Sequence, residues 1–159
     1  MIFVDANVFL RHLVAPATPE DRISARQAAE LFRRVEKGQE EITTSEATLA
    51  EVVFILSAER HYNTPRQTVV TGLKPLLRPN SCRLDEKAIC MEALDVWLAN
   101  PRLSFPDALA AAYSRQLGYE LATFDKRLSQ VPGISMHSFR EPPPNGRQEK
   151  QPDEDARTS

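Results

Sequence analysis

The chain has 159 residues, of which 42% are hydrophobic and 26% charged, and its formal net charge is −2. This is the balance of a globular protein long enough to close a core without disulfides, and it excludes a broadly basic nucleic-acid coat or a polybasic membrane anchor. The N-terminal apolar run breaks at Asp5, so we expect no signal peptide or membrane span. The two cysteines, Cys82 and Cys90, are too few and too far apart for a disulfide scaffold. Reduced thiols and a cytoplasmic location are therefore expected.

The charge is unevenly distributed along the chain. Residues 1–140 hold 17 acidic and 17 basic residues, whereas residues 141–159 hold five acidic and three basic ones. The C-terminal stretch also carries the run Pro142-Pro143-Pro144 and almost no apolar residues. It cannot bury enough surface to offset its ordering entropy. We predict a folded domain over residues 1–140 and a disordered, acidic and proline-rich tail over residues 141–159.

Short apolar runs alternate with amphipathic stretches along the predicted domain. In chain order we expect a strand at 2–4, helices at 8–14 and 21–37, a strand at 42–44, helices at 45–59 and 65–76, a strand at 81–84, helices at 86–98 and 104–117, and strands at 119–124 and 134–137. Gly38 and Gly118 stand where helices commonly stop. Strands that alternate with helices predict an α/β fold, a three-layer α/β/α sandwich around a central, mainly parallel sheet.

Three aspartates fall at the ends of predicted elements. Asp5 directly follows the first strand, Asp125 follows the strand at 119–124, and Asp107 lies in the first turn of the helix from 104. Ligands of open parallel sheets bind at the carboxyl ends of the strands, so these side chains are candidates for a site. Each also has a structural explanation as a turn or cap residue, and Ser104 with Asp107 matches a capping box.

Glu51 is harder to explain as a structural residue. It stands in the apolar stretch LAEVVFIL, which predicts a helix buried around most of its circumference. A buried carboxylate costs several kcal/mol, roughly, unless it has a cation, a basic partner or a wet cleft. Glu46 points about 140° away from Glu51 on the same helix and is expected at the surface. We therefore take Glu51 as the fourth candidate.

Four carboxylates at one sheet edge repel one another unless a cation joins them. Oxygen ligands of this kind suit Mg²⁺ or Mn²⁺, and such an ion activates a bound water for attack on a phosphodiester. The three histidines, His12, His61 and His137, lie far apart in sequence and match no zinc spacing. The chain has no glycine-rich phosphate loop and no GxSxG motif.

Four stretches resemble the PIN-domain ribonucleases, and within them the VapC-type toxins of bacterial toxin–antitoxin pairs. They are IFVDANVFL at 2–10, TSEATLAEVV at 44–53, FPDALAAA at 105–112 and LATFDKRL at 121–128. They occur in the family's order, and the resemblance spans about residues 1–139. It implies a central parallel sheet flanked by helices, with an acidic pocket for Mg²⁺ or Mn²⁺.

Carried over by position, the pocket acids are Asp5, Glu51, Asp107 and Asp125, with Asn7 and Thr123 at the family's supporting polar positions. The resemblance implies a metal-dependent endoribonuclease in which a metal-activated water cleaves RNA and leaves a 5′-phosphate. It also implies a cognate antitoxin protein and a homodimer. Lys126 and Arg127 are candidates for phosphate contacts, although a solvated helix start is the simpler interpretation.

Two other functions stay open from the sequence. A PIN-like binding module without catalysis would act through its partner or its tail, but the complete set of four acids argues against it. An acid-based phosphatase of the haloacid-dehalogenase type would use Asp5 as nucleophile after a strand. That chemistry needs a second aspartate two residues later, where this chain has Asn7.

Overall fold

The computed structural model describes residues 1–140, so the predicted tail lies outside the described residues. The elements are β1 (Ile2–Phe3), α1 (Ala6–Leu13), α2 (Pro19–Glu36), β2 (Ile42–Thr43), α3 (Glu46–Ser57), α4 (Arg66–Leu77), α5 (Lys87–Ala99), α6 (Phe105–Leu117), β3 (Glu120–Leu121), the 3-10 turn η1 (Leu128–Gln130) and β4 (Ser135–Met136). The α/β class is confirmed, and every predicted helix is present. No helix within residues 1–140 is long and apolar enough to cross a membrane.

The helix boundaries follow local signals. Thr18 and Ser104 begin α2 and α6 with capping boxes, in which the cap side chain and the third helical residue satisfy each other's backbone N–H. Gly118 ends α6 in the left-handed region, at φ 69°. Gly38 has the same φ one residue after the C-cap of α2. Both glycines therefore stop helices as predicted, because the left-handed conformation costs glycine little.

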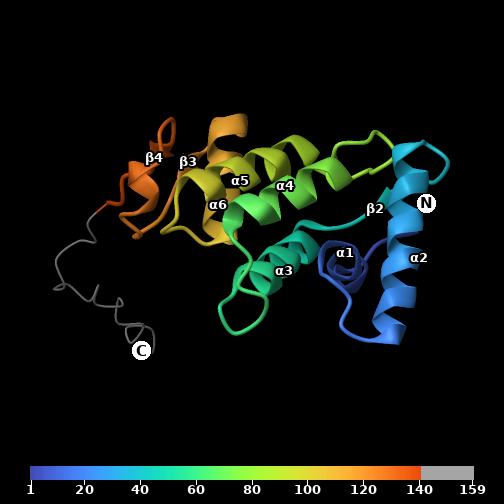
Figure 1. Ribbon diagram of the computed structural model, residues 1–159. Helices are drawn as coiled ribbons and strands as arrows, with labels where there is room; N and C mark the ends of the chain where they lie inside the picture. The colour runs from blue at the N-terminus through green and yellow to red at the C-terminus, as the bar shows by residue number, and fades with distance from the viewer. Residues whose placement is uncertain (141–159) are drawn as a thin grey trace, which may run out of the picture.

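The strands are parallel, as the predicted α/β/α arrangement requires, and they form two short ladders. β1 pairs with β2 in parallel, with Ile2 opposite Ile42, and β3 pairs with β4 in parallel, with Leu121 opposite Met136. The strand predicted at 81–84 is reduced to an isolated bridge between Cys82 and Ile42. The two pairs form separate sheets, and Figure 1 shows them toward opposite ends of the molecule, with α3 to α6 between them.

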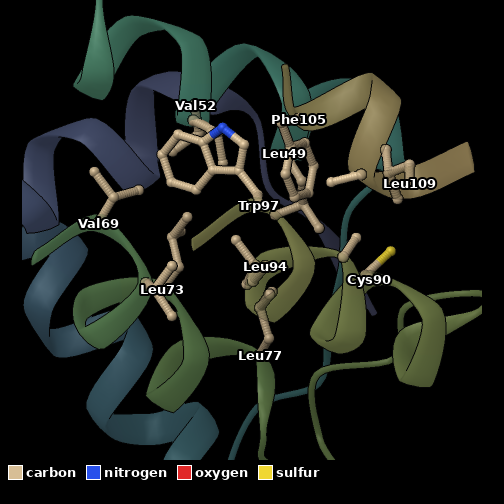
Figure 2. Close-up of a cluster of buried hydrophobic side chains, with 14 of the residues drawn as sticks. Leu49, Val52, Val69, Leu73, Leu77, Cys90, Leu94, Trp97, Phe105 and Leu109 are labelled. Carbon is tan, nitrogen blue, oxygen red and sulfur yellow. The ribbon is translucent and has the colours of Figure 1, made fainter. Parts of the chain in front are cut away.

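The packed centre of the molecule is helical. Figure 2 shows side chains from α3, α4, α5 and α6 meeting in one cluster, in which the Trp97 ring stands among leucines and valines. The buried members shown there include Leu49, Val52, Val69, Leu73, Leu77, Cys90, Leu94, Trp97, Phe105 and Leu109. Both cysteines are buried and free, as expected, and burial raises the pKa of Cys90 to about 12.

Arg66, at the start of α4, closes one end of this core. Its guanidinium lies 4.3 Å from the centre of the Trp97 ring. It donates hydrogen bonds to the carbonyl oxygens of Trp97, Asn100, Pro101 and Leu103, at 2.6 to 3.3 Å. One side chain thereby satisfies the carbonyls at the C-terminal end of α5 and in the turn that follows it.

Candidate acidic site

Asp5 lies at the carboxyl end of β1, where the sequence placed it. Its Oδ1 accepts the N–H of Val8 at 3.3 Å, so it is also the N-cap of α1. The N–H of Val4 donates to the carbonyl of Thr43 at 2.9 Å, and the hydroxyl of Thr44 donates to the carbonyl of Val4 at 2.9 Å. The end of β1 is therefore fixed against β2, while the Asp5 side chain is exposed to solvent.

Asp107 is held at the start of α6 by the predicted capping box. Its Oδ2 accepts the backbone N–H of Ser104 at 2.9 Å and the Ser104 hydroxyl at 2.8 Å. The Asp107 N–H donates to the Ser104 oxygen at 3.2 Å. The Asp107 side chain is 27% exposed, and its hydrogen bonds with Ser104 both use Oδ2. The capping role and a site role therefore do not compete for the same atom.

Asp125 is clamped by an arginine two residues later. Arg127 donates from Nε to both carboxylate oxygens at 2.9 Å and from Nη2 to Oδ2 at 2.5 Å. These hydrogen bonds lower the pKa of Asp125 and raise the pKa of Arg127. The backbone N–H groups of Arg127 and Asp125 bond to Asp125 Oδ1 and Thr123 Oγ1, which fixes the turn.

Arg127 also connects this turn to the start of α6. Its Nη2 lies 3.9 Å from Asp107 Oδ2, and its Nη1 donates to the carbonyl of Arg102 at 2.8 Å. Arg127 stands at the start of η1 with its side chain 51% exposed, which agrees with the solvated helix start that the sequence favoured, and the structure adds its contacts with Asp125 and Asp107. A signal was present, because an arginine two residues after an aspartate in a tight turn can fold back onto it.

The structure contradicts the predicted burial of Glu51, whose side chain is exposed. The apolar residues of α3 that are buried, Leu49, Val52, Val53 and Leu56, leave another face of the helix to solvent. Glu51 shares that face with Phe54, which is 51% exposed. Residues adjacent in sequence point in different directions around a helix, so apolar neighbours did not enclose Glu51. Burial therefore gives no reason for Glu51 to hold a cation.

Glu46 is the more enclosed carboxylate of α3, against expectation. It is half-buried and accepts the hydroxyl of Tyr113 from α6. This hydrogen bond, with burial and the nearby charge of Glu46, raises the pKa of Tyr113 to about 12. The contact joins α3 to α6, and nothing in the sequence marked Tyr113 as its partner.

The structure brings some of the predicted site residues together and leaves others apart. Asp107 and Asp125 share Arg127, whereas Asp5 follows β1, which pairs with β2 in a sheet separate from that of β3 and β4. In residues 1–140, no three His, Cys, Asp or Glu side chains are grouped so that they could hold one metal ion. The donors are all carboxylates, which suit a hard divalent cation in chemistry, but the described part of the chain does not bring three of them together.

The family model described as PIN domain matches residues 2–134, which is most of the chain. No curated protein matches the chain. The four predicted acids all lie inside the matched range.

Proposed function

Since this chain belongs to the PIN domain family, a family of typically metal-dependent nucleases, we propose that it is an endoribonuclease and the toxin of a toxin–antitoxin pair. The observation that carries the proposal is the pairing of Asp107 and Asp125 around one cationic group. Two carboxylates fixed by the backbone and neutralised by an arginine make a position where a positive charge already binds. A divalent cation can take the place of that charge.

In this proposal Asp5, Glu51, Asp107 and Asp125 would hold Mg²⁺ or Mn²⁺, directly or through water, although within residues 1–140 no three of these side chains are grouped around one point. When bound, the ion lowers the pKa of a water molecule and offsets charge that develops on the phosphodiester. Ser104 fixes the carboxylate of Asp107, and Thr123 fixes the turn that carries Asp125. These contacts orient the two acids before any ligand arrives.

The surface beside Asp5 offers room for an RNA strand. Asn7 and Arg11 of α1 and Ser24 and Gln27 of α2 line a groove of about 480 Å³. Their amide, hydroxyl and guanidinium groups can donate hydrogen bonds to phosphate and sugar oxygens. Asn7 stands in the first turn of α1, which Asp5 caps, and thereby connects the groove to the end of β1 through the backbone; Asp5 itself does not line the groove. Cleavage there would leave a 5′-phosphate, as the resemblance implies.

Cleavage of a structured RNA by the full chain in Mg²⁺ tests the activity. We expect cleavage that stops on chelation with EDTA. Asp5→Asn and Asp107→Asn should each lower the rate of cleavage by more than about 100-fold. This is more than the loss typical of a residue that only contacts a metal ligand. Glu36→Gln, an exposed acid at the end of α2, is the matched control and should cleave normally. Cleavage that survives EDTA or either aspartate change contradicts the proposal.

The toxin role is tested separately in cells. We propose that the chain acts in the cytoplasm and that its antitoxin is encoded beside it. Expression of the chain alone should arrest growth, and co-expression of the neighbouring reading frame should relieve the arrest. Continued growth of cells that contain active enzyme would contradict the toxin role, while the proposed nuclease activity would still stand.

A further inference from the structure

Two aromatic side chains stand side by side just beyond the paired strands β3 and β4, which Figure 1 shows next to each other. Leu121 lies opposite Met136 in the ladder, and Phe124 and Phe139 follow these two residues by three positions each. The two rings stack, with their centres 4.4 Å apart and their planes 17° from parallel. The parallel register of the strands therefore brings the two rings together.

The stacked pair leaves one ring face open to solvent. Phe124 is 86% exposed, the highest value among the large hydrophobic side chains of residues 1–140, and Phe139 is 49% exposed. Phe139 covers one face of the Phe124 ring, so the exposed area includes the opposite face. An aromatic ring gains free energy when a partner covers such a face, and a flat partner covers it best.

Neighbouring contacts hold the aromatic pair in place. The ring of His137 meets the edge of the Phe139 ring at 86°, with the centres 5.4 Å apart. The backbone N–H of His137 donates to the carbonyl of Leu121 at 3.0 Å, which connects the two strand ends. In the turn that follows β3, the N–H of Asp125 donates to the hydroxyl oxygen of Thr123 at 3.0 Å. A fixed turn therefore presents the open ring face, so covering it requires little ordering of the chain.

The charges around the pair favour a polyanion. Lys126 lies two residues after Phe124, Arg140 lies directly after Phe139, and both cationic side chains are exposed. The acids of this segment, Glu120 and Asp125, each contact a basic side chain already. An open aromatic face flanked by cations suits a nucleobase with its phosphates better than it suits an apolar protein surface.

We propose that Phe124 is a stacking platform for an unpaired base of the RNA, next to the phosphodiester that is cleaved. This rests on the proposed function, since Asp125, one of its four acids, directly follows Phe124 in the chain. The Cα atoms of the two residues are about 3.8 Å apart, so a base on the ring keeps its phosphate close to the turn that carries Asp125. The base must be unpaired, because the faces of a base inside a duplex are covered by its neighbours.

Binding without cleavage tests the stacking. The full chain is titrated into a fluorescently labelled single-stranded RNA in EDTA, and fluorescence anisotropy gives the affinity. Phe124→Ala should weaken binding by roughly 5- to 150-fold, the range expected for one base stacked on one aromatic ring. Phe124→Leu should also bind weakly, since leucine is apolar but has no flat ring. Phe124→Tyr is the matched control and should bind like the wild type, and all three variants should keep the wild-type circular-dichroism spectrum.

Removing bases from the RNA gives the complementary measurement. Abasic nucleotides replace the bases of the same RNA one at a time. At the stacked position the abasic RNA should bind the wild type more weakly than the intact RNA does. The same replacement should change nothing further in Phe124→Ala, because the two changes remove one and the same contact.

The outcomes separate the platform from the nuclease. Equal RNA affinity of the wild type, Phe124→Ala and Phe124→Leu overturns the platform, and so does a wild type that binds no RNA. A Phe124→Leu chain that keeps its RNA affinity but sediments differently assigns the ring to a protein contact and also overturns it. RNA that is bound with the aromatic preference but is not cut in Mg²⁺ supports the platform and contradicts the proposed nuclease. Cleavage by a chain whose Phe124 variants all bind normally does the reverse.

Discussion

The helical centre and the two strand-bearing ends of this protein are stabilised in different ways. The centre consists of α3 to α6, whose inward-facing apolar side chains are buried together (Figure 2). At the ends, two-residue strands pair in isolation, and Phe3 and Phe124 are 61% and 86% exposed. The centre supplies most of the hydrophobic stabilisation, because that contribution scales with apolar area removed from water.

The candidate chemistry is divided in the same way. Asp5, Asp107 and Asp125 all stand at ends of elements, where backbone N–H groups donate hydrogen bonds to their carboxylate oxygens. They differ in charge balance, because Asp125 has Arg127 beside it and Asp5 has no ion-pair partner among the described residues. Substitutions at the ends should therefore affect the candidate site more than the stability of the fold, which depends on the centre.

The largest effect should come from opening the centre. Leu94 on α5 is 1% exposed, and Leu94→Ala should lower the free energy of unfolding by about 2–5 kcal/mol, through lost burial and a residual cavity. Phe124→Ala, at the exposed end, should change it by less than about 0.5 kcal/mol. Urea denaturation at a protein concentration where the chain is monomeric measures both. An equal loss of unfolding free energy in the two variants would contradict the difference between the centre and the ends.

Arg66 gives a smaller effect at the border of the centre. Arg66→Ala removes its hydrogen bonds to four carbonyl groups and its contact with Trp97, and should cost about 2–4 kcal/mol of unfolding free energy. Arg66→Lys should recover only part of this, because an ammonium group cannot reach all of these acceptors in one plane. Equal stability of the lysine variant and the wild type, by the same denaturation, would contradict the assigned role.

Local signals in the sequence were sufficient for the helices and the caps. Ser104 with Asp107 marks the first residue of α6, and Gly118 marks its end. Both signals are readable from the sequence because they depend only on residues a few positions away. The spacing of the apolar residues also predicts which face of a helix is buried, but only when each residue is placed by its angle around the helix axis. Glu51 shows the error that follows when apolar residues adjacent in sequence are taken as adjacent in space.

Contacts between distant segments could not be predicted in this way. The ladder of β1 with β2 and that of β3 with β4 each depend on only two residue pairs, and no local pattern fixes which strands meet. The same holds for Glu46 with Tyr113, which lie 67 residues apart in the chain. The motif residues of the candidate site were predicted, but their distribution over two sheets was not.

The smallest effect concerns the two glutamates of α3 and tests which of them is enclosed. The phenol of Tyr113 has a pKa of about 12 because it donates to Glu46. Since this pKa is raised above the ordinary tyrosine value of about 10, the stabilisation is complete below that pH and is lost as the pH rises toward 12. The absorbance at 295 nm of the wild type minus that of Tyr113→Phe isolates this titration.

Glu46→Gln should move the midpoint of this titration down, because the charge that disfavours the phenolate is removed. Glu51→Gln is the matched control on the same helix and should leave the midpoint where it is, since Glu51 points to solvent. If the Glu51 variant moves the midpoint and the Glu46 variant does not, then Glu51 is the enclosed carboxylate. The original interpretation of α3 from the sequence would then be restored, and with it the energetic argument for a cation at that position.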